Sequence, residues 1–251
     1  MDTLTLITFN AWFEQHHNPR RYRALVTLLE QNDADIIALQ EATPALWMLL
    51  AQTSWAQGYT VLDDDIQDRV GGVMLLSRIP VHHSALYELP SDFGRNLLVA
   101  ELENGFTVAT VHLESRRAST QVRHAQMEAI FARLERHREA ALVGDFNFGA
   151  ASAENIHLDP RYVDVWPLLH PSAPGYTCDT LHNRMRLQVH RKAKQARYDR
   201  VLLRSSGRRW RPSTITLLGT EPIDDGQQPE LFPSDHFGLK AQLIRIDHSQ
   251  A

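Results

Sequence analysis

Single polar side chains stand at the ends of several short apolar segments of this sequence. Each is an Asn, a carboxylate or a His, and the set comprises Asn10, Glu41, His112, Asp145, Asp235 and His236. Turn chemistry at such positions would favour Gly and Pro. Each residue taken alone suits an ordinary turn or the first turn of a helix, but the recurrence at so many segment ends favours one shared site.

These residue types suit a hard divalent cation and a phosphate ester. Mg²⁺ takes oxygen ligands, keeps several waters and is often held by one or two carboxylates together with substrate phosphate oxygens. Glu41 and Asp235 are the natural ligands in this set, with Mn²⁺ as the alternative ion. Hydrolysis of a phosphodiester needs neutralised phosphate oxygens, an oriented water and stabilisation of the charge that develops in the transition state. The set contains groups for each task.

Other catalytic chemistries lack their sequence signatures. The chain contains no GxSxG elbow, no glycine-rich phosphate loop and no HExxH motif. The single cysteine, Cys178, excludes an intramolecular disulfide and a thiolate zinc cluster, and no neighbouring His marks it as an activated nucleophile. We interpret His16, His17, His182 and His190 as surface histidines, because they have no convergent partners. Covalent catalysis is therefore not indicated.

Short strands must position these side chains. Apolar runs of strand length recur without an internal repeat or a linker, at residues 4–9, 36–39, 73–76, 97–102, 106–111, 140–143, 201–203 and 239–246. Runs that are apolar throughout are typical of sheet that is covered on both faces. In a mixed sheet, the C-terminal ends of some strands and the N-terminal ends of others share one rim, so the polar residues at those ends would converge.

Three helices are predicted between the strands. Pro19 opens one that ends before the turn at 32–35, and Thr43 caps a second that starts at Pro44 and continues to residue 51. The third and longest spans 117–138, with an apolar stripe and with its Arg, Glu and His residues facing water. The Asn-Gly pair at 104–105 predicts a hairpin between the flanking strands. Hairpins between helical crossovers indicate an α/β fold with mixed sheets and helices outside.

Length and composition agree with this layout. The chain has 251 residues, 43% hydrophobic and 22% charged, which excludes the disordered and low-complexity classes and suits one domain over 1–251. No apolar stretch approaches the roughly 18 to 20 residues that span a bilayer, and the N-terminus lacks a signal-peptide pattern. With a single cysteine, these features favour a cytoplasmic protein without a membrane segment.

The net charge of −4 provides no general attraction to nucleic acid, so any such attraction must be local. The segment 184–211 carries eleven Lys or Arg residues and one acidic residue, Asp199. It is either a candidate basic surface or a solvated Arg-rich loop with its flanking strands.

Six short motifs occur in the order that is typical of one known family. They are Thr8-Phe-Asn10, Leu39-Gln-Glu41, Val111-His-Leu113, Gly144-Asp-Phe-Asn147, Tyr198-Asp-Arg200 and Ser234-Asp-His236. On these motifs the chain resembles the endonuclease/exonuclease/phosphatase family of metal-dependent phosphoesterases. The resemblance implies a DNase I-like α/β fold, a four-layer α/β sandwich of two central mixed β-sheets flanked by helices. Segments 94–98, 112–115, 164–166 and 176–180 are most similar to the tyrosyl-DNA phosphodiesterase 2 branch of the family.

The resemblance also implies a role for each residue at a motif position. On the metal side, Glu41 would be the principal Mg²⁺ ligand, with Asp235 and Asn10 beside it. On the catalytic side, Asp145 would orient or deprotonate the attacking water, and His236 would contact the phosphate while Asp199 fixes its tautomer. The remaining carried-over positions would contact the nucleophile or the phosphate, and they are Asn10, Asn147, His112, Ser115, Arg95 and Asn96. Either Asp145 or His236 would act as the base.

Two positions depart from the family pattern. Many relatives carry an acidic residue where this chain has Trp12, which implies a weaker or differently arranged metal site. The phosphodiesterase branch can place an aromatic residue, suited to stacking on a base, where this chain has Cys178. The resemblance therefore implies no aromatic contact to a DNA base at position 178.

The sequence predicts a Mg²⁺-dependent phosphodiesterase that uses in-line attack of a carboxylate-activated water. Its expected substrate is a nucleic-acid end, a protein-linked nucleotide or a nucleotide-like ester. No feature of the sequence identifies a protein partner. One alternative is a phospholipid or inositol-phosphate phosphoesterase, which the absence of an amphipathic membrane-binding segment disfavours. The other is a catalytically weak binding domain, motivated by Trp12.

Overall fold

Strands that are apolar on both faces bring two sheets to the centre of the molecule. The structure, a computed structural model, describes residues 3–63, 71–207, 209–227 and 230–246. The first sheet has the strand order β13 (Trp210–Leu218), β14 (Gly238–Arg245), β1 (Thr3–Asn10), β2 (Ile36–Ala42), β4 (Gly72–Ser77) and β3 (Thr60–Asp63). The second has the order β5 (Val81–Glu88), β6 (Asn96–Leu102), β7 (Thr107–His112), β8 (Glu139–Asp145), β12 (Asp199–Ser205) and β9 (Val163–Asp164).

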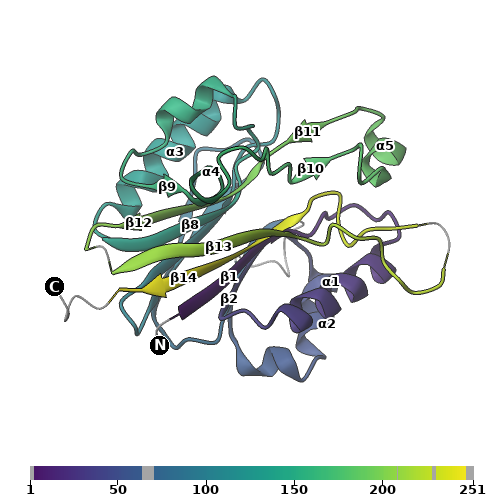
Figure 1. Cartoon of the computed structure of the whole chain (residues 1–251), viewed down its shortest axis with the longest axis horizontal. Helices are drawn as coiled ribbons and strands as arrows, with labels where there is room; N and C mark the ends of the chain where they lie inside the picture. Colours follow the sequence, from purple (N-terminus) through teal and green to yellow (C-terminus); the bar gives the residue numbers. More distant parts are fainter. Residues whose placement is uncertain (1–2, 64–70, 208, 228–229, 247–251) are drawn as a thin grey trace.

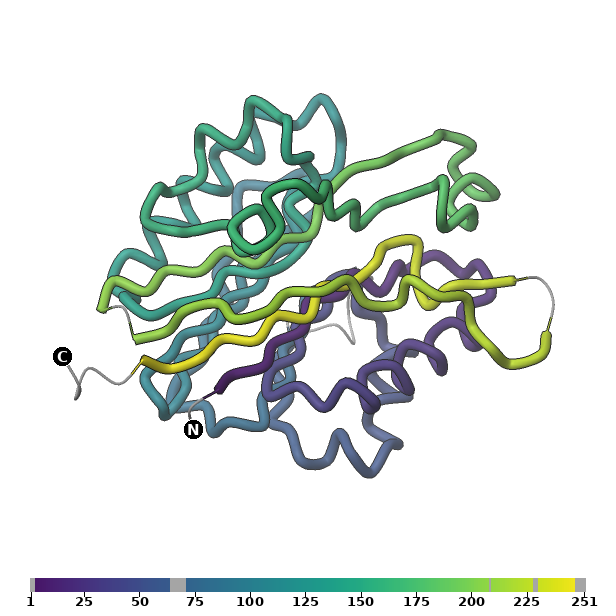
Figure 2. Tube along the Cα trace, in the orientation of Figure 1, coloured from purple at the N-terminus to yellow at the C-terminus, as the bar shows by residue number. Residues whose placement is uncertain are grey.

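The helices α1 (Asn18–Asn32), α2 (Pro44–Ala51) and α3 (Thr120–Leu134) cover the outer faces of the two sheets (Figure 1). The short helix α4 (Val165–Leu169) packs against β12 and β13 and contributes to the core between the sheets, and α5 (Met185–His190) lies apart from both sheets. The 3-10 turns are η1 (Trp55–Gly58) and η2 (Ala153–His157). The Cα trace shows α1 and α2 below the first sheet and α3 above the second (Figure 2). The β1–β2 and β7–β8 pairs are parallel and the other pairs antiparallel, so both sheets are mixed. The predicted four-layer sandwich is confirmed.

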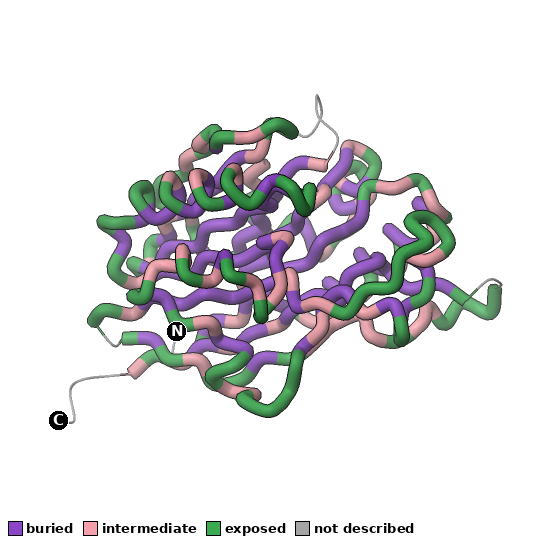
Figure 3. Tube along the Cα trace, turned by 90° about the horizontal axis from the view of Figure 1, so that it is seen from above, coloured by how far each residue is buried: buried purple, intermediate pink, exposed green. Residues whose placement is uncertain are grey.

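Strand periodicity divides the apolar side chains between separate cores. Leu4 and Leu6 of β1 face the second sheet, whereas Ile7 and Phe9 pack with α1 and α2. A third cluster joins the outer face of the second sheet to α3 through residues such as Ile130. The buried residues accordingly concentrate in the central strands (Figure 3). Burial of a large apolar side chain contributes about 1.5–3 kcal/mol, so these cores hold the strand ends in fixed positions.

The apolar runs locate the buried strands but miss those at the sheet edges. Each run coincides with a strand, and the predicted hairpin between β6 and β7 is confirmed. The strands β5 and β13 escape the pattern because they are edge strands with many exposed polar residues, and β13 contains Pro212 at a bulge. The third helix is shorter than predicted, since α3 covers only Thr120–Leu134. Its Arg123 is buried instead of facing water.

The strands β10 (Cys178–Asp179) and β11 (Gln195–Ala196) form a small separate ladder. With α5 they make an insert that projects beyond the sandwich, next to the C-terminal ends of β1 and β8 (Figure 1). The start of β1 and the end of β14 lie at the opposite end (Figure 1). Within the described residues, no helix is long and apolar enough to cross a membrane.

The segment 184–211 does not form one basic surface. Arg197, Arg200 and Arg204 are buried, and the first two form ion pairs with Asp164. The exposed cations of the insert are Arg184, Arg191, Lys192 and Lys194. Arg209 and Arg211 lie instead at the start of β13, at the end of β12 away from Asp199, and Arg208 lies outside the described residues. The cations are thus divided between two ends of the molecule.

Gly144, the residue before Asp145, allows β7 and β8 to approach closely. Its φ is +135°, and an added Cβ atom would lie 1.9 Å from the carbonyl oxygen of Val111. Both features exclude a side chain, because the contact is with backbone and the conformation is strained for an L-residue.

We expect Gly144→Ala to lower the free energy of unfolding by about 3 kcal/mol or more, because β7 and β8 must separate. Urea denaturation measures this, with Gly58→Ala as the control, since a Cβ atom added at Gly58 would have no neighbouring atom within 4 Å. A loss as small as that of the control would contradict the close approach.

Candidate active site

The polar residues from six segments meet at one rim of the sandwich. Strands of the two sheets bring their C-terminal ends there with Asn10, Glu41, His112 and Asp145, while β12 begins there with Asp199. Asp235 and His236 precede β14 at the same rim. The contacts described below connect the two sheets directly. Residues more than two hundred positions apart in the chain therefore share one site.

Asn10 lies at the centre of this group. Its Nδ2 donates to Glu41 Oε1 at 3.1 Å and to Asp145 Oδ2 at 3.0 Å, so one amide joins a carboxylate of each sheet. Its Oδ1 accepts from the Trp12 backbone N–H at 3.0 Å. In this arrangement Asn10 presents a donor to the carboxylates, which suits it to orienting them.

The backbone turns Glu41 toward the rim. The β2–β4 register shifts between Leu39 and Ala42, and Glu41 has a φ of +55°. Its Oε2 accepts from the Phe13 backbone N–H at 2.9 Å. Burial, together with the negative charge of Asp235, raises the pKa of Glu41 to about 7. The carboxylate is thus held at the rim, where burial and the neighbouring negative charge disfavour its ionised form.

Asp145 and Asn147 form a second unit beside Asn10. The Asn147 backbone N–H donates to Asp145 Oδ1 at 2.8 Å, and Asn147 Nδ2 donates to the Leu113 carbonyl at 2.9 Å. Asn147 has a φ of +56°, a conformation that Asn tolerates better than most residues. Burial and the charge of Asp199 raise the pKa of Asp145 to about 6. Asp145 is consequently ionised at neutral pH but more basic than an exposed aspartate.

His236 and Asp199 are a buried hydrogen-bonded pair. The His236 Nδ1 atom lies 2.8 Å from Asp199 Oδ2 and 3.9 Å from Asp145 Oδ2. Burial alone would lower the pKa of His236, but the charges of Asp199, Asp235 and Asp145 outweigh it and raise that pKa well above its usual value. These charges therefore favour the imidazolium form of His236. Such a group stabilises negative charge and cannot accept a proton.

His112 differs from His236 because its surroundings favour the neutral imidazole. Arg95 Nη1 donates to His112 Nδ1 at 3.0 Å, which leaves the proton on Nε2. That Nε2 atom lies 3.6 Å from Asp145 Oδ2 and 4.0 Å from Glu41 Oε1. Burial, then the charges of Arg95 and His236, lower the pKa of His112 well below its usual value. His112 is thus a neutral N–H donor that points toward the carboxylates.

Three further residues support the rim, and the sequence did not single them out for this. Arg186 of the insert forms an ion pair with Asp235. The Ser234 hydroxyl donates to the Asn10 carbonyl and accepts from the His236 backbone N–H. Thr177 Oγ1 accepts from the Tyr198 and Asp199 backbone N–H groups at 3.0 and 3.1 Å. Ser234 stands inside a recognised motif, but no pattern of spacing pairs Arg186 with Asp235.

A buried arginine fixes the loop that follows β1. Arg21 of α1 donates to the backbone carbonyls of Ala11, Trp12, Glu14, His16 and Pro233. The Trp12 ring stacks on this guanidinium at 4.6 Å and packs with Met185 and Phe237. Trp12 therefore anchors the loop in an apolar cluster, and its side chain offers no oxygen ligand to a metal ion. Cys178 is fully buried as well, so it presents no surface for base stacking.

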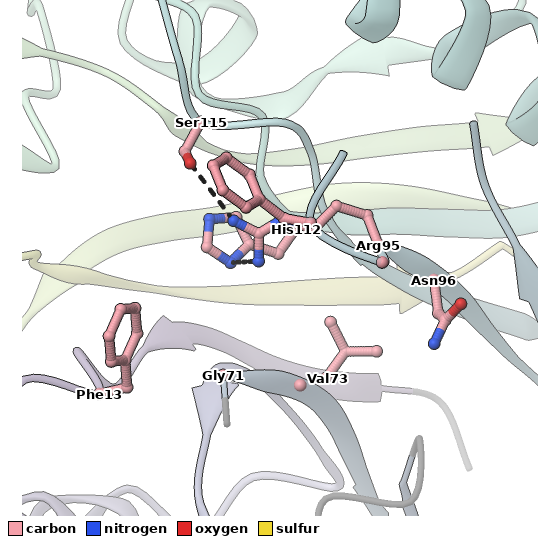
Figure 4. A pocket seen from close by; sticks show the side chains of 10 residues that line it. Phe13, Gly71, Val73, Arg95, Asn96, His112 and Ser115 are labelled. Atoms are coloured by element: carbon pink, nitrogen blue, oxygen red, sulfur yellow. Dashed lines mark hydrogen bonds between the residues drawn. The ribbon is translucent and has the colours of Figure 1, made fainter. Parts of the chain in front are cut away.

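A cavity of about 250 Å³ opens beside His112, between the two sheets. Phe13, Gly71 and Val73 lie on one side, and Arg95, His112 and Ser115 face them from the other (Figure 4). Arg95 Nη2 donates to Ser115 Oγ at 3.4 Å, and the Arg95 guanidinium lies 5.8 Å from the Phe93 ring, which also lines the cavity. Asn96 completes this wall. The cavity thus combines aromatic surface with a cation next to the carboxylates.

The charges at the rim fit a divalent cation. Glu41, Asp145, Asp199 and Asp235 are buried or nearly so, and among the described residues only His236 and Arg186 pair with them directly as cations. Asp199 Oδ1 is buried and has no hydrogen-bond partner in the described part of the chain. Ligand atoms of Asp145, Asp199 and His236 lie within 4.8 Å of one another. A metal ion bound to these three residues would compete with the proton shared by His236 and Asp199.

Comparison with known proteins shows the family to which this chain belongs. A family model described as the Endonuclease/Exonuclease/phosphatase family matches residues 7–236. Tyrosyl-DNA phosphodiesterase 2 of Gallus gallus is 28% identical over 98% of this chain and 67% of its own length. The Mus musculus protein of that name is 27% identical over 96% of this chain and 66% of its own length. The chain therefore spans about two thirds of these relatives.

Solved structures of similar proteins agree with this family assignment. Danio rerio TDP2 complexed with single strand DNA product has a TM-score of 0.85 and 25% identity, and the match covers 96% of this chain and 98% of that one. An endonuclease/exonuclease/phosphatase family protein from Bacteroides thetaiotaomicron has a TM-score of 0.74 at 16% identity, with 98% of both chains covered. The second likeness shows the fold alone. The resemblance predicted from the motifs is confirmed.

We expect Asp199→Asn to lower the pKa of His236, because it removes the strongest of the influences that raise it. NMR titration of the imidazole in metal-free buffer measures the shift, with the exposed Asp224→Asn as control. The folded pKa exceeds the unfolded value of roughly 6.5, so this pair stabilises the fold fully below that pH and the contribution is lost as pH rises through the folded pKa. An unchanged titration in Asp199→Asn would contradict the pairing.

Proposed function

The chain belongs to the endonuclease/exonuclease/phosphatase family of phosphoesterases, and we propose that it hydrolyses phosphodiesters by in-line attack of a water activated by Asp145. One observation carries the proposal. The Asn10 amide holds Asp145 and Glu41 on either side of one point, and the protonated His236 lies next to Asp145. A base, a cation site and a charge-stabilising donor thus share a single rim.

The two candidates for the base differ in protonation. His236 carries its proton at neutral pH, whereas Asp145 is ionised and has a pKa of about 6. A base is most effective when its pKa lies near the working pH. We therefore assign proton abstraction to Asp145, with Asn147 orienting it through the backbone N–H contact.

The remaining donors suit the phosphate oxygens. His236 provides an imidazolium, held by Asp199, to offset the charge that grows in the transition state. His112 Nε2 provides a neutral N–H, and Arg95 and Ser115 stand behind it at the cavity wall. Asn96 belongs to the same wall. These donors are fixed by the protein before substrate arrives, so they need little reorganisation.

Glu41 and Asp235 are the proposed ligands of Mg²⁺, with Mn²⁺ as the alternative. When bound, the ion would neutralise phosphate oxygens and stabilise the leaving oxygen. Its positive charge would also lower the pKa of Glu41 from about 7, so that the carboxylate is fully ionised in the loaded enzyme.

The proposed substrate is a nucleotide joined through its phosphate to an aromatic alcohol. The cavity beside His112 has Phe13 and Phe93 in its walls and Arg95 close to Phe93, so a planar aromatic leaving group would meet aromatic surface and a cation. The exposed cations of the insert, among them Arg191 and Lys194, suit a nucleic-acid backbone. The names of the relatives, tyrosyl-DNA phosphodiesterases, agree with both features.

We expect Asp145→Asn to lower kcat for bis-p-nitrophenyl phosphate by about 1,000-fold, because the attacking water loses its base. EDTA should abolish the wild-type reaction and added Mg²⁺ or Mn²⁺ should restore it. Absorbance of the released nitrophenolate measures both effects, and the exposed Asp224→Asn serves as the matched control. Equal rates in Asp145→Asn and wild type would end the proposal.

A panel of 5′-phosphotyrosyl DNA, abasic duplex DNA, short RNA and sphingomyelin separates the substrate classes. We expect kcat/KM for the phosphotyrosyl substrate to exceed the others by about 10-fold or more, because only its leaving group fills the cavity. Product analysis by mass spectrometry measures the rates. A preference for sphingomyelin would instead favour the phospholipid alternative.

A further inference from the structure

We infer that Glu114 is a positioning residue that fixes Phe93 in the wall of the leaving-group cavity. The inference rests on the proposed function of that cavity. Glu114 is fully buried, two positions after His112 and directly before Ser115. Its carboxylate contributes nothing to the carboxylate cluster at the rim and points instead toward the loop that precedes β6.

A chain of two hydrogen bonds joins Glu114 to Phe93. Glu114 Oε2 accepts from the Ser91 hydroxyl at 2.6 Å and from the Asp92 backbone N–H at 3.0 Å. The Ser91 Oγ atom in turn accepts from the Phe93 backbone N–H at 3.0 Å. The loop tip is exposed, but the buried Glu114 carboxylate contacts Ser91 and Asp92 directly and Phe93 through Ser91.

Glu114 is itself held firmly. Its backbone N–H donates to Gln126 Oε1 at 2.9 Å, and its carbonyl accepts from Arg123 Nη1 at 2.7 Å. Both partners are buried on α3. The carboxylate is thus anchored to the second sheet and its covering helix, and it transfers that rigidity to the loop.

The other end of the loop is attached to the site by different contacts. The Leu89 backbone N–H donates to the Arg95 carbonyl at 3.0 Å and closes the loop. Arg95 contacts His112 and Ser115 through its guanidinium. Residues 112–115 therefore fix both ends of the wall, with the Arg95 end held by His112 and Ser115 and the Phe93 end held by Glu114.

The position of Phe93 makes this attachment useful for specificity. The ring is 44% exposed, lines the cavity and lies 4.6 Å from the Arg116 guanidinium and 5.8 Å from that of Arg95. Two cations beside one ring leave it poised to contact an aromatic group in the cavity. Small displacements of such a wall are costly to a substrate that must fit against it.

Paired substrates test the inference. One is a 5′-phosphotyrosyl oligonucleotide and the other carries a trifluoroethyl group on the same 5′-phosphate, so only the first fills the cavity. We expect Glu114→Ala to raise KM for the phosphotyrosyl substrate about 10-fold and to change KM for the trifluoroethyl substrate less than about 2-fold. Glu114→Gln should behave as wild type, because its amide oxygen can still accept both hydrogen bonds. The exposed Glu128→Ala on α3 is the control.

A double-mutant cycle identifies Phe93 as the residue through which Glu114 acts. Phe93→Ser should raise KM for the phosphotyrosyl substrate as Glu114→Ala does, and the double variant should be no worse than either single one. Equal losses on both substrates, or additive effects in the double variant, would overturn the inference. Should Glu114→Ala fail to fold by circular dichroism, Ser91→Ala breaks the same chain of hydrogen bonds at a half-exposed position.

Hydrogen exchange tests the attachment without turnover. We expect the Asp92 and Phe93 amides to exchange about 10-fold faster in Glu114→Ala than in wild type. The Asp92 N–H loses its acceptor, and the Phe93 N–H keeps an acceptor, the Ser91 hydroxyl, that Glu114 no longer holds in place. Unchanged exchange would overturn the inference. If wild type cleaved neither substrate while these amides responded as expected, the proposed function would fail and the positioning role of Glu114 would stand.

Discussion

Burial of several carboxylates side by side is the constraint that organises this structure. Glu41, Asp145, Asp199 and Asp235 lie at one rim, where each charge must be offset because water is largely excluded. The Asn10 amide serves two of them, the His236 proton serves a third and Arg186 serves the fourth. What remains uncompensated appears as raised pKa values at Glu41 and Asp145. The proposed function depends on this excess of negative charge.

The supporting structure maintains this arrangement from both sheets. Gly144 lets β8 lie against β7 so that Asp145 and His112 end side by side. Arg21 fixes the loop after β1, which supplies the Phe13 N–H to Glu41. Thr177 aligns the start of β12. Each of these three residues acts on backbone groups. Residues that belong to no recognisable sequence pattern can therefore determine the geometry of the site.

The sequence predicts the interior strands and the rim well because both depend on local pattern. A fully apolar run such as that of β7 has one stable place, between the layers, and a polar residue at its end must then stand at an edge. Edge strands such as β5 mix polar and apolar residues and carry no such signal. Buried arginines were missed for a related reason, since Arg21 and Arg123 are compensated by carbonyls and carboxylates from distant segments. The Arg186–Asp235 pair likewise exists only after the insert folds back on the rim.

The features that we propose for catalysis and for specificity are built on the same short segment. Residues 112–115 provide a donor to the rim, contact Arg95 and fix the loop that carries Phe93. In this proposal, chemistry and leaving-group recognition are mechanically coupled, because a shift of this strand end would move both. The two sheets contribute opposite walls of the cavity, so the sandwich itself sets its width.

The most direct test of the central claim is a titration of Mn²⁺ into the protein, followed by electron paramagnetic resonance. If the excess of buried negative charge forms a cation site, wild type binds one ion per chain and Glu41→Gln, which removes one charge but little volume, binds it at least about 10-fold more weakly. Identical titration curves for the two proteins would contradict the account.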